Sequence, residues 1–146
     1  MSEKLSLNVF VINIVVNNRS EFLLIQEAKS SVRGKWFFPA GPKKPKENLI
    51  ETAIRKTEVE SGIICEPRAF LNIIHQINGT EAFQIIMISE PTKGKLKTEE
   101  NTESIQARWF KKEAIKNLNL RTPAVLEIID KYEKRQFISV DSFYQF

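Results

Sequence analysis

The chain has 146 residues, of which 42% are hydrophobic, including ten Phe and two Trp, and this is enough apolar material for the core of one ordinary domain. No run of about eighteen apolar residues and no secretory leader pattern is present, which predicts a cytoplasmic protein without a membrane span. The single Cys65 excludes an internal disulfide. The net charge of +4 is spread among acidic residues, which favours a small anionic ligand over a nucleic-acid partner.

Two strands are expected at the start of the chain. Residues 5–16 are mostly β-branched or apolar, which predicts a long strand buried on both faces for part of its length. Residues 17–20 are typical of a turn, and residues 21–27 are expected to return as the second strand of a hairpin. After a polar loop, the apolar segment 36–41 predicts a short strand that Pro39 brings to a stop.

A helix is expected to follow from Glu47 or Asn48 to Gly62. The two prolines before it, Pro42 and Pro45, cannot lie inside a helix. Its apolar positions recur every three or four residues, and Gly62 is a typical helix end. These positions are Leu49, Ile50, Ala53, Ile54 and Thr57.

The second half of the chain predicts further strands. Residues 69–76 and 81–89 read as two strands joined by an Asn78-Gly79 turn, and residues 107–110 as a shorter one. A polar loop, residues 91–103, is expected between them.

Two helices and an apolar tail are expected after these strands. The helices are predicted at 111–118 and at about 122–134, where Thr122 and Pro123 are good helix-start residues. The tail from Arg135 to Phe146 is rich in aromatic residues, so we expect it to pack on the domain or on another subunit, which leaves a homodimer open. The order of elements predicts the α+β class, with a mixed sheet between helices, rather than repeated βαβ units.

The stretch from Gly41 to Ile63 resembles the signature of the Nudix hydrolases, G-x5-E-x7-R-E-U-x-E-E-x-G-U, in which U is apolar. Five residues separate Gly41 from Glu47, seven more lead to Arg55, and Gly62 with Ile63 closes the motif. The flanking segments WFFPAG and ESIQARWF also resemble those of the family. The resemblance covers about residues 5–134, and it implies one Nudix-like α/β/α sandwich domain over residues 1–146.

This resemblance implies hydrolysis of the pyrophosphate bond in a nucleoside diphosphate derivative, with Mg²⁺ or Mn²⁺ as the cofactor. The family places three metal-binding glutamates in R-E-U-x-E-E, and this chain has Arg55-Lys56-Thr57-Glu58-Val59-Glu60. Only Glu60 remains as a metal ligand. The resemblance therefore gives Glu60, Arg55 as its electrostatic partner, and Glu103 as a second acid as the candidate catalytic residues.

Helical geometry places the departures on one face. At about 100° per residue, Lys56, Val59 and Glu60 share one sector, whereas Glu58 lies about 160° from Glu60. Replacing two glutamates with lysine and valine makes this face three charge units more positive than the family pattern. Lys56 is therefore a candidate to hold a phosphate directly, as a metal does in relatives, although a lysine cannot generate a metal-bound hydroxide. Glu51 and Arg55 are expected to pair on the solvated side.

Other residues are candidates for the ligand. Lys43 belongs to a small basic cluster with Lys44 and Lys46 and is a second candidate for phosphate. Trp36 and Phe38 are candidates to stack on a nucleobase. Glu103 is preferred to Glu99 and Glu100 of the same loop for the role of second acid, although a solvated loop is the more common role for such residues. His75, in an apolar strand, is expected to be a packed or hydrogen-bonded core residue rather than a base.

Two functions remain open from the sequence. The first is a Nudix hydrolase of a nucleoside diphosphate derivative with weak activity, and the segments WFFPAG and Leu120-Arg121-Thr122-Pro123 are similar to enzymes that act on oxidised nucleoside diphosphates. The second is a catalytically silent Nudix-fold module that binds a nucleotide, without metal, or another protein. Whether the chain is an enzyme is left undecided at this point.

Overall fold

Two β-sheets, three α-helices and one 3₁₀ turn make up residues 7–143, the part of the chain that the computed structural model describes. The strands are β1 (Asn8–Val15), β2 (Phe22–Glu27), β3 (Trp36–Phe37), β4 (Ala40–Pro42), β5 (Ile63–Gln76), β6 (Ala82–Gly94), β7 (Ser104–Phe110) and β8 (Ile138–Ser139). The helices are α1 (Leu49–Ser61), α2 (Lys112–Ile115) and α3 (Ala124–Glu133), and the 3₁₀ turn is η1 (Val140–Ser142).

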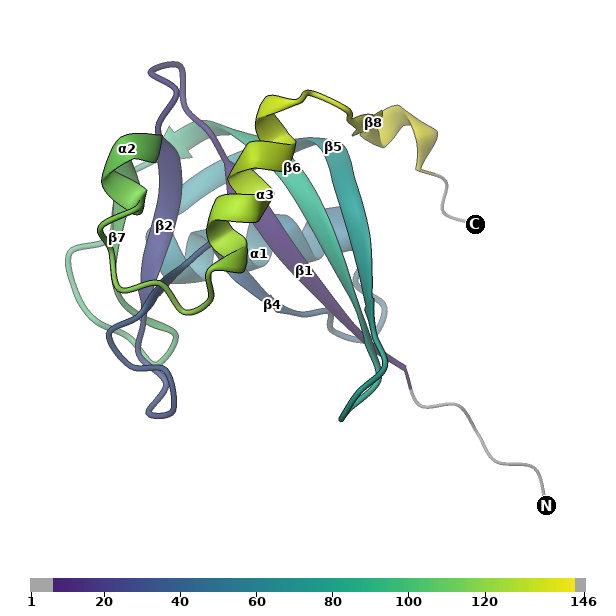
Figure 1. The fold of residues 1–146 in the computed structure, drawn as a ribbon, viewed down its shortest axis with the longest axis horizontal. Coiled ribbons are helices and arrows are strands. Elements are labelled where there is room, and N and C mark those ends of the chain that lie inside the picture. The colour runs from purple at the N-terminus through teal and green to yellow at the C-terminus, as the bar shows by residue number, and fades with distance from the viewer. Residues whose placement is uncertain (1–6, 144–146) are drawn as a thin grey trace.

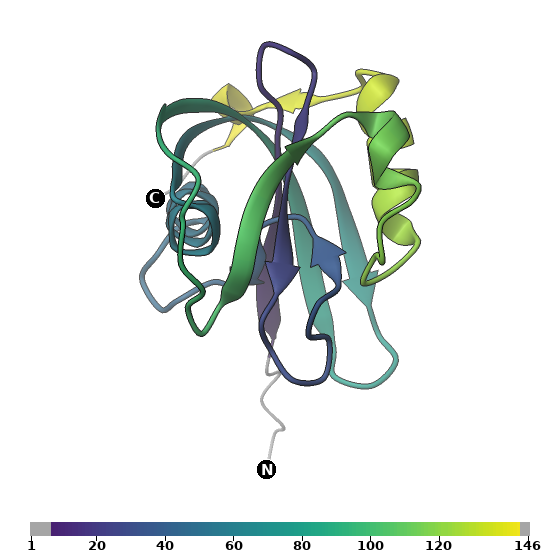
Figure 2. The same cartoon turned by 90° about the vertical axis from the view of Figure 1, so that its left-hand side faces the viewer.

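The larger sheet is mixed and has the order β4-β1-β6-β5-β8, in which only β1 and β6 run parallel. The smaller sheet, β3-β2-β7, is antiparallel. Helix α1 covers one side of the sheets, while α2 and α3 lie on the other side (Figures 1 and 2). The expected α+β sandwich with a mixed sheet is confirmed.

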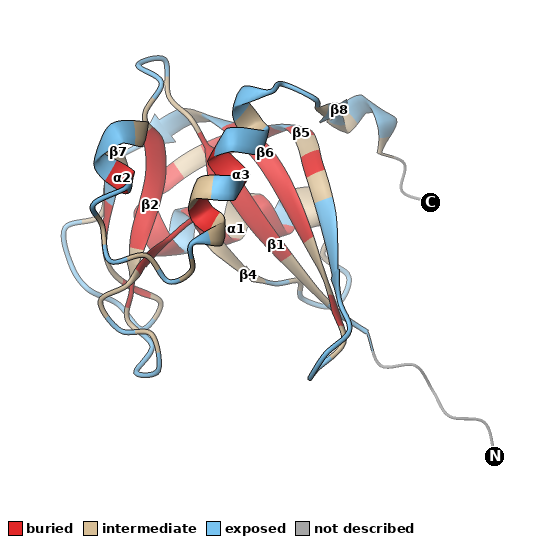
Figure 3. Cartoon of the chain, viewed as in Figure 1, coloured by how far each residue is buried: buried red, intermediate tan, exposed pale blue. Residues whose placement is uncertain are grey.

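Strand β1 is buried on both faces, as its composition predicts (Figure 3). Val11 packs with residues of α1, whereas Ile12 and Ile14 pack in the cluster that includes residues of α3. The strand therefore separates two apolar layers, one under each group of helices.

The predicted pairing of β1 with β2 is wrong, although the turn between them is present. Only an isolated bridge joins Val16 to Phe22, and β2 pairs instead with β3 and β7. Both edges of β1 are already occupied by β4 and β6, so the returning strand has to join a second sheet.

Strands β5 and β6 are longer than expected. Strand β5 begins at Ile63, directly after α1, and β6 continues to Gly94 through a segment that predicts a polar loop. Pro67 and Pro91 lack a backbone N–H donor, but the strand register shifts beside each of them. The sheet can therefore accommodate both prolines, because a regular hydrogen bond is not required at every position. Pairing of the two strands outweighs the local loop preference.

A buried polar group holds α1 on the larger sheet. The side-chain amide of Asn13 in β1 donates to Thr57 Oγ1 at 2.8 Å, and its carbonyl oxygen accepts from Ser89 Oγ of β6 at 2.7 Å. All three residues are almost completely buried. Satisfied bonds of this kind orient the helix, because breaking one would leave a buried polar atom unpaired.

The described part of the C-terminal tail packs on its own domain. Strand β8 pairs with β5 at Ala69 and Phe70, and the ring of Phe143 lies 5.7 Å from that of Phe70. Residues 1–6 and 144–146, which include Leu5 of the first expected strand and two aromatic residues of the tail, lie outside the described residues. Within residues 7–143 no helix is long and apolar enough to cross a membrane.

The end of α1 gives a first prediction. Gly62 has a φ of 85°, and a Cβ there would overlap the carbonyl oxygen of Lys95 and lie 3.1 Å from the amide nitrogen of Lys97. We expect Gly62→Ala to lower the free energy of unfolding by about 2 kcal/mol or more in urea titrations, because left-handed strain adds to a backbone clash. Gly79→Ala is the control: its φ is 78° but the space around it is open, so a loss of only about 1 kcal/mol is expected. Equal losses for both variants would contradict the close approach at Gly62.

Candidate functional site

Helix α1 carries two side chains into the candidate site, and its two ends are well defined. Asn48 caps the helix by accepting from the Glu51 amide at 2.8 Å, and the Glu51 carboxylate accepts from the Asn48 amide at 3.0 Å. Gly62 ends it in the left-handed conformation. The helix so fixed presents Lys56 and Glu60, one turn apart, to the same cavity.

The cavity has a volume of about 830 Å³, within the range of small-molecule sites. The charged residues of its wall belong to four parts of the chain: helix α1, the end of β2 with the residues after it, the end of the loop before β7, and the segment before α3. These charged residues are Lys56, Glu60, Glu27, Lys29, Glu103 and Arg121. The rest of the wall is mostly apolar or carries amides, and includes Phe10, Ile12, Phe37, Ile74, Gln76, Gln84, Ala124 and Ile128.

Lys56 is buried, with only 6% of its surface exposed. Its aliphatic chain lies against Gly41 of β4, where a Cβ would overlap Cε and lie 2.7 Å from Cδ of the lysine. Its ammonium donates to Glu103 Oε2 at 2.8 Å. Gly41, which has no Cβ, therefore lets the lysine stem lie directly against the backbone.

Glu60 is 3% exposed, and its Oε1 accepts from the backbone amide of Ala40 at 2.8 Å. Burial raises the pKa of this carboxyl from 4.5 to about 8, because removal from water outweighs the favourable field of Lys56 and the bond from Ala40. Glu60 is therefore mostly protonated at neutral pH. A protonated carboxyl is a poor metal ligand and cannot act as a base.

Glu103 lies at the end of the loop between β6 and β7, and its side chain is 43% exposed. The bond from Lys56 holds the pKa of this carboxyl below its usual value, so it is ionised. Asn101 fixes the loop: its side chain accepts from the Glu103 amide at 2.9 Å and donates to the carbonyl of Val59 at 2.9 Å. Of the three loop acids considered, Glu103 is the one that lines the cavity.

Arg55 does not form an ion pair with Glu60 or with Glu51. Its guanidinium donates twice to Glu47, at 2.7 and 2.9 Å, and once to the carbonyl of Pro42 at 3.0 Å. These bonds lower the pKa of Glu47 to about 2. Glu51 is already used in the helix cap, so the expected i, i+4 pair does not form. Arg55 instead clamps the loop before α1 onto the helix.

Val59 of the altered face and Glu58 beside it are both exposed. Val59 is 41% exposed, although it lies in the same helical sector as Lys56 and Glu60. Glu58 is exposed and is not among the residues that line the cavity. The prediction that Glu58 points elsewhere therefore fits the described geometry, and it does not replace a missing ligand.

The aromatic candidates Trp36 and Phe38 need a correction. Phe38 is completely buried, and Trp36 is buried with its ring edge-on to Phe110 at 5.0 Å. Both pack in the main apolar cluster and neither lines the cavity. Phe37, the residue between them, is the one that reaches the cavity wall.

Lys43 also lies outside the site. Its ammonium donates to the carbonyl of Lys44 at 2.8 Å, and it lines a separate cavity of about 620 Å³ with Phe83 and Phe143. The prediction that it holds a phosphate together with Lys56 is not supported by this placement.

Several lining residues are not among the sequence-based candidates. Arg121 donates to Glu27 at 3.2 Å, and its guanidinium lies 5.5 Å from the centre of the Phe37 ring. Gln84 donates to Gln76 at 3.3 Å on the neighbouring strand. The sequence offered a signal for two of these residues: Glu27 is charged although it ends an apolar strand, and Arg121 comes just before the start of a helix.

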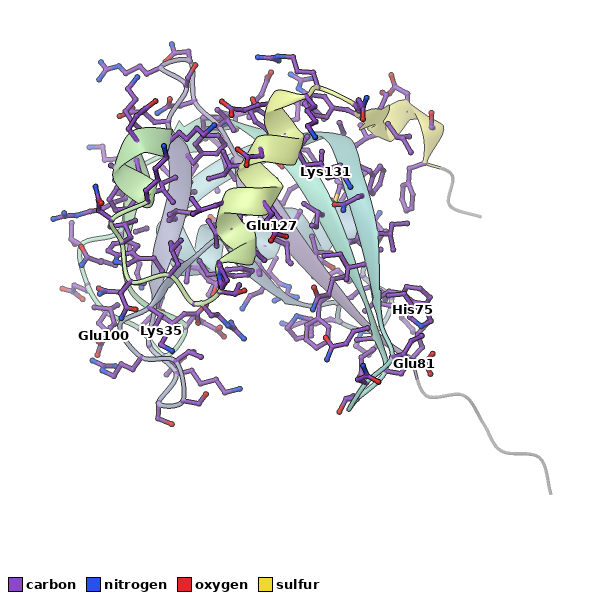
Figure 4. The ribbon with its side chains drawn as sticks, in the orientation of Figure 1. Lys35, His75, Glu81, Glu100, Glu127 and Lys131 are labelled. Atoms are coloured by element: carbon purple, nitrogen blue, oxygen red, sulfur yellow. The ribbon has the colours of Figure 1, made fainter. Side chains whose placement is uncertain are left out.

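His75 is not a core residue, contrary to expectation. It lies with Glu81 at the free end of the β5–β6 hairpin (Figure 4), and its Nε2 is 2.9 Å from the Glu81 carboxylate. Glu100 lies in an outer loop in the same view and accepts from Arg33 at 2.6 Å. Neither His75 nor Glu100 lines the cavity.

Solved structures share this fold. A NUDIX hydrolase from Nitrosomonas europaea superposes with a TM-score of 0.85 over 97% of this chain and 98% of that chain, at 23% identity. The NUDIX domain of Shewanella oneidensis NrtR, solved in complex with ADP ribose, superposes with a TM-score of 0.72 over 90% of each chain, at 15% identity. The arrangement of sheets and helices is therefore that of the Nudix fold.

The family follows from the sequence match as well. The model of the NUDIX domain matches residues 6–132, so the chain belongs to the Nudix family. Phosphatase NudJ of Shigella boydii is 31% identical over 84% of this chain and 81% of its own length. Human 8-oxo-dGDP phosphatase NUDT18 is 34% identical over 82% of this chain, but this chain spans only 37% of that protein.

Nudix hydrolases generally use divalent metals such as Mg²⁺ or Mn²⁺, and the residues present here do not fit such an ion. Within residues 7–143 no group of three acidic, histidine or cysteine side chains is placed to hold a metal. Glu103, whose pKa is lowered, already neutralises the ammonium of Lys56. A hard cation needs several oxygen ligands and would meet a fixed positive charge here.

The raised pKa of Glu60 predicts a pH-dependent stability. The folded state keeps a proton that the unfolded state loses, so the free energy of unfolding should fall as pH rises from about 4.5 to about 8 and then level off. Glu60→Gln keeps an acceptor for the Ala40 amide and should remove this decline, with a gain of several kcal/mol at pH 9, since each pKa unit corresponds to about 1.4 kcal/mol.

Urea titrations at a series of pH values measure this effect. The lowered pKa values of Glu47 and Glu103 act only below about 4.5, outside the window. Glu58→Gln, an exposed change on the same helix, should keep the wild-type decline. A decline that is equally steep in Glu60→Gln would show that Glu60 is ionised in the folded protein at neutral pH.

Proposed function

We propose that this domain binds a nucleoside diphosphate derivative in the cavity beside Lys56 and hydrolyses its pyrophosphate bond only slowly. The observation that carries this proposal is the buried lysine at a position where the family pattern has a metal-binding glutamate. The site can attract a diphosphate, but it lacks the groups that would activate water.

The charges of the cavity support an anionic ligand. Three cationic side chains, Lys56, Lys29 and Arg121, line the cavity with two acids, Glu27 and Glu103, and with the protonated Glu60. Fixed cationic groups of this kind bind phosphate by charge-assisted hydrogen bonds. The net positive cavity therefore favours the phosphate portion of a ligand.

The remaining wall supports a nucleoside as the other portion. Phe10 and Phe37 supply aromatic surface, and the paired amides of Gln84 and Gln76 supply both donors and acceptors. A volume of about 830 Å³ is large enough for a nucleotide. Because NUDT18 is an 8-oxo-dGDP phosphatase, oxidised purine nucleoside diphosphates are the first ligands to test.

Slow hydrolysis follows from the state of the two acids. A general base has to be unprotonated and basic near the working pH. Glu60 is mostly protonated, and Glu103 is a weak base because Lys56 lowers its pKa. Neither carboxyl meets both conditions at neutral pH.

The alternative function is a silent binding domain, and the Lys56–Glu103 ion pair favours it. The ammonium of Lys56 is neutralised by the second acid, so neither member of this pair is free to orient water. The two functions share the ligand and differ only in turnover, so a measurement of product formation separates them.

Restoring the family's acids tests the proposal. The double variant Lys56→Glu with Val59→Glu should gain metal-dependent hydrolysis of 8-oxo-dGDP or dGDP by about 10²-fold or more, because a single group that stabilises charge in the transition state is worth about 10²–10³ in kcat. Wild type should show a low rate that millimolar Mg²⁺ or Mn²⁺ does not raise by more than a few-fold. Anion-exchange chromatography of the mononucleotide product measures both rates.

The control is Lys56→Gln with Val59→Gln, which removes the lysine without adding acids and should be no faster than wild type. Circular dichroism and thermal melting establish that each variant is folded. A folded Glu/Glu variant that is no faster than this control would contradict the view that only the acids are missing. Rapid metal-dependent turnover by wild type would contradict slow hydrolysis directly.

A further inference from the structure

We propose that Glu103 is an exchangeable counter-ion on Lys56, and that a ligand's diphosphate binds by displacing it, without help from a divalent metal. This inference rests on the proposed function and adds which group pairs with Lys56 before a ligand binds. One member of the ion pair is fixed, and the other is free to leave.

Lys56 is the fixed member. Its side chain is only 7% exposed, and its stem lies against the backbone of Gly41. The lysine also belongs to α1, which the buried bond between Thr57 and Asn13 holds on the sheet. Burial of the stem therefore keeps the ammonium at the cavity wall, whereas Glu103 reaches it from a more exposed position.

Glu103 is the exchangeable member. Its carboxylate reaches Lys56 from the solvent side, and its side chain is 43% exposed. The loop backbone is held independently, because Asn101 accepts from the amides of Glu103 and Ser104 at 2.9 Å each. The carboxylate can therefore rotate into solvent without unfolding the loop.

A diphosphate is a stronger partner for the ammonium than a single carboxylate. It carries more negative charge and more acceptor oxygens, and charge-assisted bonds to phosphate are among the strongest in proteins. The exchange leaves no buried charge unpaired, because the diphosphate takes the place of the carboxylate on the ammonium. The displaced Glu103 is then solvated.

A divalent ion adds nothing to this exchange. The position beside Glu60 and Glu103 already holds the positive charge of Lys56, and two cations at close range repel each other. Binding of the diphosphate should therefore be as tight in EDTA as in Mg²⁺.

Calorimetry with the non-hydrolysable α,β-methylene analogue of dGDP tests both parts. For wild type, the Kd in EDTA and in millimolar MgCl₂ should agree within about twofold. Glu103→Gln should tighten binding by about three- to fivefold, because a competing charge is lost. Lys56→Gln should weaken it by about 10–100-fold, the usual worth of a hydrogen bond to a charged group.

Glu100→Gln is the matched control. It removes the same charge from the same loop, but Glu100 pairs with Arg33 rather than with Lys56. It should leave the Kd unchanged within about twofold, as expected for an exposed charge away from the site. In the Lys56→Gln background, Glu103→Gln should no longer tighten binding, because the two effects are coupled.

The outcomes separate this inference from the proposed function. No measurable binding of the analogue or of dGDP to wild type would contradict the proposed function itself. Binding that tightens tenfold or more with Mg²⁺ would contradict only the metal-independent exchange, and so would a Glu103→Gln variant that binds no tighter than Glu100→Gln. Because Glu103→Gln changes a partly exposed side chain, its comparison with Glu100→Gln and wild type remains valid even if Lys56→Gln does not fold.

Discussion

The ammonium of Lys56 is held inside the domain, and the chemistry of the site follows from its position. Gly41 leaves room for the lysine stem, and Glu103 neutralises its charge from the solvent side at 2.8 Å. Glu60, on the next turn of the helix, is so deeply buried that its carboxyl keeps a proton near neutral pH even beside this cation. A cluster of acids that would hold a divalent ion is thus replaced by one internal cation with one ionised partner.

The chain keeps the contacts that stabilise the fold, although it lacks the acid cluster of the family pattern. Arg55 still binds the helix to the preceding loop through Glu47, and Gly62 still ends the helix where β5 begins. The apolar position of the motif that Thr57 occupies is compensated by Asn13, which supplies a buried hydrogen bond. These contacts stabilise the architecture without contributing a metal ligand. The chain therefore belongs to the Nudix family although its helix lacks two of the three acids of the family pattern.

Local sequence patterns predicted much of the fold and part of the site. The spacing from Gly41 to Gly62 predicted the helix, and helical geometry grouped Lys56 with Glu60 and excluded Glu58. Pairings between distant segments could not be read in this way: Glu103 lies 47 residues from its partner Lys56, and Asn13 lies 44 residues from Thr57. The burial of Trp36 and Phe38 depends on packing by α2 and α3, which no pattern in their own strand reveals. The same limit explains why β2 joined a second sheet.

The central claim is that the site contains an internal cation in place of a metal centre. The most direct test is a titration of the isotope-labelled protein with Mn²⁺, followed by the paramagnetic broadening of backbone amide resonances in NMR spectra. In the wild-type protein we expect no selective broadening of Ala40, Gly41, Glu60 or Glu103 before general surface effects appear, whereas the Lys56→Glu with Val59→Glu variant should show it at these amides. Selective broadening of these four amides in the wild-type protein would show that a divalent ion binds beside Lys56, and it would rule out an internal cation in place of the metal.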